Sequence, residues 1–132
     1  FHLPCIRLYH HTMKPHLAFR LILGDDIALG PGKVQLLEAI KDTGSIAAAG
    51  RAMGMSYKRA WSLVEEMNAA FAAPLVTSAR GGTGGGGAVL TDNGAEVLRL
   101  YRLALERAEA GAAEPVAALE AMLRMADRSG GK

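Results

Sequence analysis

The chain has 132 residues, of which half are hydrophobic and 21% are charged. This length fits one domain, or one small domain with an added helix, and the composition excludes a chain that is disordered throughout. The single cysteine excludes an internal disulfide framework and a thiolate metal site, which fits a reducing cytoplasm. No apolar stretch reaches the roughly 18 residues of a membrane helix, so no membrane partner is expected.

Charge is unevenly distributed, although the formal net charge is only +2. Residues 31–91 carry six basic and four acidic side chains, whereas residues 92–129 carry five basic and seven acidic ones. The middle of the chain is therefore the part that would meet a polyanion.

The first residues do not resemble a folded segment. Residues 1–16 are expected to be a disordered leader, and residues 1–12 are either native, a remnant added to the natural protein, or a region upstream of a start at Met13. The segment contains His2, His10, His11 and His16. Because these histidines lie at a terminus without acidic neighbours, no metal site is expected.

Hydrophobic periodicity and turn residues predict the elements. In chain order these are a strand over 17–23, helices over 33–42, 46–53 and 57–70, strands over 75–78 and 88–90, and a long helix over about 92–110. Gly111 is expected to break the long helix, and Glu114-Pro115 is expected to start a last one.

This order of elements predicts a mostly α protein with a small β component, a winged helix-turn-helix with long C-terminal dimerisation helices. The predicted DNA-binding domain spans residues 17–110, and residues 111–132 form a C-terminal helix and tail.

The helix predicted over 57–70 has the side chains of a DNA recognition helix near its N-terminal end: Ser56, Lys58, Arg59 and Ser62. Helix-turn-helix proteins place this end in the major groove, where Lys and Arg bind guanine and Ser binds phosphate or base. The alternative is an ordinary solvated face that Glu65 and Glu66 balance. Trp61 shares a face with Val64 and is expected in the core.

The glycine run over 81–87 contains a match to G-x-G-x-x-G. A strand follows it instead of a helix, so it cannot bind a dinucleotide as that fingerprint does, and no cofactor is expected. The run is interpreted as the tip of a wing that approaches DNA, with Arg80, Thr83 and Gly84 as contacts. The alternative is a flexible linker in a long hairpin.

Two stretches resemble the DNA-binding domain of the molybdate-dependent transcriptional regulators, the ModE family. The first begins at Thr43-Gly44-Ser45, continues through Ser56-Tyr57-Lys58-Arg59-Ala60-Trp61 and ends at Glu66-Met67-Asn68. The second is the glycine-rich run from Arg80 to Thr91, followed by Gly94 and a leucine-rich helix with Tyr101. The first stretch also matches the wider LysR-type helix-turn-helix pattern. The resemblance covers roughly residues 17–110.

The resemblance implies a bacterial homodimer that binds double-stranded DNA at a palindromic operator and regulates molybdenum-related genes. Full-length family members hold molybdate in a separate C-terminal region of two small β-barrel repeats. This chain stops at Lys132 without such a region, so molybdate binding is not expected within it; it is either a stand-alone DNA-binding version or a fragment. The DNA-binding residues carried over are Ser45, capping toward phosphate, and Ser56, Tyr57, Lys58, Arg59, Ser62, Arg80, Thr83 and Gly84.

A dimer is also expected on physical grounds, because one recognition helix covers only a few base pairs. The long helix has more apolar surface than one small domain can cover. The residues expected in the dimer interface are Leu98, Leu100, Tyr101 and Leu105, together with the N-terminal segment.

Two functions from different classes are consistent with these sequence features. The first is a sequence-specific transcription regulator, and the second is a winged-helix protein-interaction module whose basic face binds an acidic partner. An enzyme is not expected, because the carboxylate pairs Asp25-Asp26 and Glu65-Glu66 are sequence neighbours and no nucleophile and base are paired.

Overall fold

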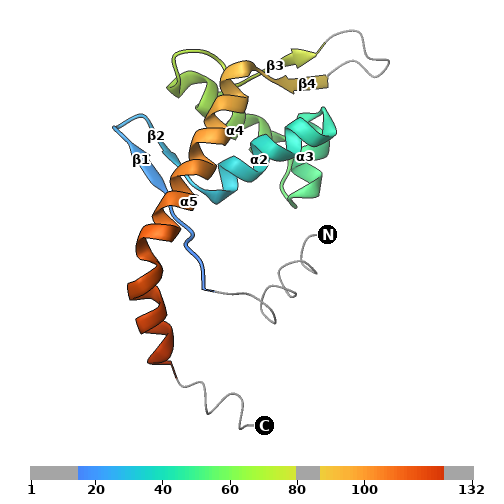
Figure 1. Ribbon diagram of the computed structural model, residues 1–132. Helices are drawn as coiled ribbons and strands as arrows, with labels where there is room; N and C mark the ends of the chain where they lie inside the picture. The colour runs from blue at the N-terminus through green and yellow to red at the C-terminus, as the bar shows by residue number, and fades with distance from the viewer. Residues whose placement is uncertain (1–14, 80–86, 124–132) are drawn as a thin grey trace, which may run out of the picture.

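The computed structural model describes residues 15–79 and 87–123. Within these ranges the elements are β1 (Leu21–Leu23), β2 (Ile27–Leu29), α2 (Pro31–Thr43), α3 (Ile46–Ala52), α4 (Tyr57–Ala70), β3 (Val76–Ala79), β4 (Gly87–Leu90) and α5 (Asp92–Ala121). Helices α2, α3 and α4 pack beside the β3–β4 hairpin, which is the wing (Figure 1). The long helix α5 follows the wing and extends away from the three helices. The mostly helical winged helix-turn-helix expected from the sequence is confirmed.

The core lies where α2 meets α3, α4 and the base of the wing. Helix α2 starts at Pro31, whose missing N–H is not needed in a first turn. It ends at Gly44, where φ is +73° and the amide donates to the Ile40 carbonyl at 2.8 Å. The largest fully buried side chains are Leu36, Leu37, Ile40, Met67 and Leu75. They come from α2, α4 and the start of the wing, so these three parts share one core.

Helices α3 and α4 form the helix-turn-helix, and each begins at a serine cap. The Ser45 Oγ accepts the Ala48 N–H at 3.0 Å, and the Ser56 Oγ accepts the Arg59 N–H at 3.0 Å. Between the helices, Gly54 has φ +74°, in the left-handed region that favours glycine. Gly50 allows close packing, since a Cβ there would lie 3.2 Å from the Ala60 Cβ.

Helix α5 is continuous from Asp92 to Ala121, so the predicted break at Gly111 and restart at Pro115 are wrong. Its 30 residues correspond to a length of about 45 Å. Pro115 removes one helical hydrogen bond, but the residues on both sides are mainly alanine and glutamate, which favour helix. The predicted boundary between residues 110 and 111 therefore lies inside one helix.

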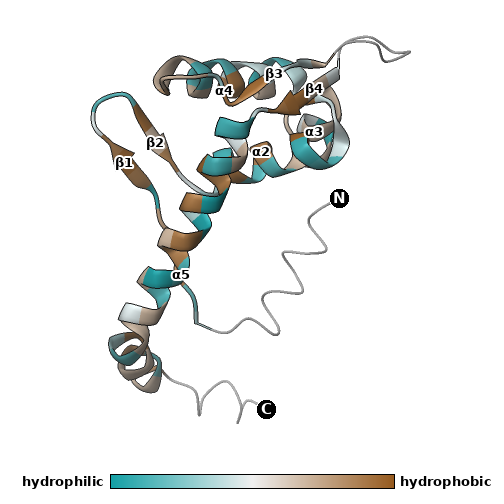
Figure 2. Cartoon of the chain, turned by 45° about the horizontal axis from the view of Figure 1, so that its top comes forward, coloured by the Kyte–Doolittle hydropathy of each residue, from teal (hydrophilic) through white to brown (hydrophobic). Residues whose placement is uncertain are grey.

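The N-terminal part differs from the predicted strand over 17–23. Only Leu21–Leu23 is a strand, and it pairs antiparallel with Ile27–Leu29, which was not predicted. Both strands of this hairpin are largely hydrophobic (Figure 2). Gly24, with φ +64°, begins the turn between them.

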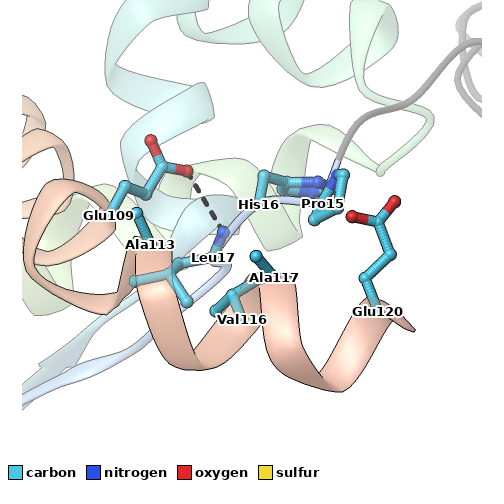
Figure 3. A pocket seen from close by; sticks show the side chains of 8 residues that line it. All are labelled: Pro15, His16, Leu17, Glu109, Ala113, Val116, Ala117 and Glu120. Atoms are coloured by element: carbon cyan, nitrogen blue, oxygen red, sulfur yellow. Dashed lines mark hydrogen bonds between the residues drawn. The ribbon is translucent and has the colours of Figure 1, made fainter. Parts of the chain in front are cut away.

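Residues 15–20 lie along α5 instead of extending the strand. The Tyr101 hydroxyl donates to the Phe19 carbonyl at 2.8 Å, and the two rings meet edge to face with centroids 5.5 Å apart. The Leu17 amide donates to a Glu109 carboxylate oxygen at 3.1 Å, at the side of a hollow of about 270 Å³ (Figure 3). These contacts replace the strand pairing expected for this segment.

Candidate nucleic-acid interface

The N-terminal end of α4 presents the predicted DNA-contacting residues together. Tyr57, Lys58, Arg59 and Ser62 are all exposed within the first two turns of the helix. Ser56, also exposed, directly precedes them and caps the helix. Free N–H groups and the helix dipole make such an end attractive to phosphate, while the neighbouring side chains can reach base edges.

Two glutamates follow further along α4, and one of them is paired. The Glu66 carboxylate lies 3.6 Å from the Lys33 ammonium, which also donates to the Ala28 carbonyl at 3.0 Å. This lysine comes from α2 and was not part of the predicted balance with Glu65 and Glu66. Because Lys33 offsets one of the two acids, the exposed face of α4 is more positive than its own residues suggest.

Ser45 lies at the start of α3 rather than on the open face of α4. Its oxygen already accepts the Ala48 amide, so the hydroxyl hydrogen is the group left to reach a phosphate. The predicted contacts Arg80, Thr83 and Gly84 lie outside the described residues.

Trp61 is not a core residue as predicted, because 46% of its surface is exposed. It precedes Val64 by three positions, a rotation of about 60° around the helix axis. Val64 points into the core and is buried, whereas Trp61 lies on the edge of that face, next to the wing. Periodicity alone could not separate these two positions.

The wing is held against α4 by Asn68, which the sequence analysis did not identify as important. The Asn68 Oδ1 accepts the amides of Leu75 and Val76 at 2.8 and 3.2 Å, and its Nδ2 donates to the Val76 carbonyl at 3.0 Å. Two sequence signals pointed to this residue: its place in the stretch that resembles the ModE family, and its position four residues after the buried Val64, just before the turn into β3.

A second attachment holds the other strand of the wing. The Ala88 amide of β4 donates to the Gly44 carbonyl at 2.9 Å, in the turn between α2 and α3. Strands β3 and β4 pair from Val76 opposite Leu90 to Ala79 opposite Gly87. The base of the wing is therefore bonded to both sides of the helix-turn-helix.

The residues predicted for a dimer interface divide into two groups. Leu98 and Tyr101 are only 2% and 5% exposed and belong to the core of the chain itself, so they are unavailable to a second copy. Leu100 is exposed and Leu105 is half-buried. Leu105 follows Leu98 by seven positions and therefore lies near the core face of α5, whereas Leu100 lies on a different side of the helix.

Within residues 15–79 and 87–123, no three His, Cys, Asp or Glu side chains are grouped as a metal site would require. No helix in the same ranges has both the length and the apolarity needed to span a bilayer.

Residues 32–95 match the family model of the bacterial regulatory helix-turn-helix proteins of the LysR family. The molybdenum-pterin-binding protein MopB of Rhodobacter capsulatus is 46% identical over 97 residues, which are 74% of this chain and 34% of that protein. The DNA-binding transcriptional dual regulator ModE of Escherichia coli K12 is 40% identical over 91 residues, 69% of this chain and 35% of that protein. The molybdenum transport protein ModE of Azotobacter vinelandii is 43% identical over 85 residues, 63% of this chain and 32% of that protein.

The chain thus spans about a third of the length of the curated relatives that it matches. The matched family model covers α2, the helix-turn-helix, the wing and the start of α5. Together, the fold, the model match and these relatives show that the helix-turn-helix domain of this chain is of the LysR type and belongs to the ModE family.

Proposed function

We propose that this protein is a transcriptional regulator that binds a palindromic operator as a homodimer and acts on molybdenum-related genes in the bacterial cytoplasm. Helix α4 would occupy the major groove, and the glycine-rich run over 81–87 would reach the DNA beside it as the tip of the wing. The observation that carries the proposal is the open N-terminal end of α4, where Lys58, Arg59 and Ser62 lie together on one exposed surface.

The position of the wing supports the same docking. Strands β3 and β4 lie beside the flank of α4 that bears Trp61, so the hairpin that they form borders the recognition surface. A helix in the major groove with a hairpin at its side would contact phosphates on both sides of that groove.

Homodimerisation is supported by apolar surface that the described chain leaves uncovered. Leu100 and Leu119 are exposed on α5, Leu123 is exposed just after its end, and Ile22 is exposed on the β1–β2 hairpin. Exposed apolar residues along a helix of this length are typical of a subunit contact. Sedimentation velocity at micromolar concentration is expected to show a dimer, and Leu100→Glu with Leu119→Glu is expected to shift it to a monomer. A monomeric unsubstituted chain would refute this part.

DNA binding is tested by fluorescence anisotropy with the duplex upstream of the protein's own gene and with a scrambled duplex, over a salt series. We expect submicromolar binding that prefers the promoter duplex and weakens steeply with salt. Lys58→Ala with Arg59→Ala should weaken binding and lower the logarithmic salt slope by about two.

The matched control is Arg99→Ala with Arg107→Ala, two exposed arginines of α5. Both double variants lower the formal net charge from +2 to 0, so a general charge effect would reduce binding equally in both. Equal losses, or no binding to either duplex at low salt, would contradict the proposal. The second result would favour the interaction-module function instead.

A further inference from the structure

We propose that Tyr57 and Trp61 of α4 recognise thymine in the major groove through its 5-methyl group. The inference rests on the proposed function, because it names the chemical feature of the DNA that this surface reads. It adds Trp61 to the predicted DNA-contacting residues, and it assigns Tyr57, which the resemblance placed among them, an apolar contact.

The two aromatic residues form an apolar stripe on the exposed side of the recognition helix. They are four positions apart, so they lie on the same flank of α4, separated by about 6 Å along the helix. Tyr57 is 56% exposed and Trp61 is 46% exposed. The core beneath is already filled by Val64 and Met67, which are buried, so the rings are not needed to complete it.

The stripe borders a groove of about 220 Å³ between α4 and the wing. Its walls include Ile46 of α3, Thr77 of β3 and Ala88 of β4. Asn68 also lines the groove, but its amide group is engaged with the backbone of Leu75 and Val76. Glu65, Thr77 and Ser78 also contribute polar groups to this groove, so its apolar part consists of the two rings and the small side chains beside them.

The charges around the stripe indicate the occupant. Lys58 and Arg59 lie between the two aromatic positions in sequence and are exposed on the same end of α4. Glu65, one turn after Trp61, also lines the groove. A partner that covers the rings must therefore accept two cations at the N-terminal end of α4 and one carboxylate towards its middle. In duplex DNA the faces of the bases are stacked on one another, and the apolar group that major-groove edges present is the thymine 5-methyl. The rise of about 6 Å along the helix axis between the two positions is close to two base-pair steps of about 3.4 Å each.

The test starts from a duplex that the full chain selects from a random pool. Each thymidine of that duplex is then replaced singly by deoxyuridine, which removes only the methyl group. For at least one position in each half-site, the affinity of the unsubstituted protein should fall about fourfold, the value for losing one buried methyl-sized group. Tyr57→Gln or Trp61→Gln should abolish the difference between thymine and uracil at that position.

Lys58→Ala is the control, because losing a charge should weaken binding to both duplexes and leave their affinity ratio unchanged. Trp61 is the only tryptophan of the chain, so its emission reports on the unsubstituted protein without relying on a variant that could fail to fold. Saturation with the selected duplex should shift this emission to shorter wavelength and protect it from acrylamide quenching, and more so than with the fully uracil-substituted duplex.

The outcomes separate this inference from the function on which it rests. A pool that yields no preferred sequence refutes specific DNA binding and the inference with it. Specific binding with equal affinity for thymine and uracil at every position, or an emission that does not change on saturation, overturns the inference alone. A methyl preference that persists in both aromatic variants also overturns it.

Discussion

Replacing Asn68 by alanine is expected to destabilise the protein by about 3 kcal/mol. The substitution removes three hydrogen bonds to the backbone at the start of β3. Each such bond contributes about 1 kcal/mol net, and more where a buried group is left without a partner. Leu75 and Val76 are both buried, so water cannot readily replace the lost contacts. For a domain of this size the loss corresponds to a fall in Tm of roughly 12 °C.

Urea unfolding followed by far-ultraviolet circular dichroism, at one fixed protein concentration, measures the effect. Asn68→Asp keeps the acceptor for the Leu75 and Val76 amides and loses only the donor, so its loss should be smaller. Asn93→Ala, at an exposed amide on the first turn of α5, should stay within about 0.5 kcal/mol of the unsubstituted protein. The reasoning is wrong if Asn68→Ala is no less stable than Asn93→Ala.

Three further substitutions test other contacts of the fold. Gly94→Ala should lower the free energy of unfolding in urea by about 2 kcal/mol or more, although alanine favours helix. The reason is that its Cβ would lie 2.3 Å from the Leu75 carbonyl oxygen. Equal stability of the variant would refute this packing argument. Gly54→Ala should cost about 1 kcal/mol, because φ is +74° at this position. Gly32→Ala, with open space around the added Cβ, should cost nothing, and similar losses in the two variants would refute the argument from backbone strain. Burial raises the pKa of Tyr101 above its ordinary value of 10.0, so the unfolded chain loses that proton first and stability should fall as the pH rises through about 10. Tyr101→Phe should lower stability near pH 7 by about 1 kcal/mol, through the lost bond to Phe19, and flatten this alkaline decline; an unchanged pH profile would contradict it.

Local sequence signals predicted much of the helix-turn-helix. Ser45 was expected as a cap, and both it and Ser56 accept the amide three residues further on. The two helices over 46–53 and 57–70 with a short gap between them, and the strands on both sides of the glycine run, were expected too. These features depend on neighbouring residues and on the stereochemistry of glycine, so they can be read without tertiary structure.

Features that depend on contacts distant in sequence were missed. Phe19 contacts Tyr101 across 82 positions, and this pairing takes the segment away from the strand that its alternation predicted. The β1–β2 hairpin has only three residues in each strand, too few for a clear period. At the site itself, whether the side of α4 that bears Trp61 is covered or exposed depends on where the wing packs. The hydrogen bonds of Asn68 hold the wing in that position.

The two attachments of the wing have a consequence for how the protein would sense the shape of its operator. One strand is bonded to Asn68 of α4 and the other to the Gly44 carbonyl, so the hairpin base and the helix move as one body. Under the proposed function, such a body would hold a set separation between α4 in the major groove and the strands β3 and β4 beside it. For a DNA ligand, sequences whose helical twist and groove width already match this separation bind without being deformed. Base pairs that neither element touches can therefore influence the choice of operator.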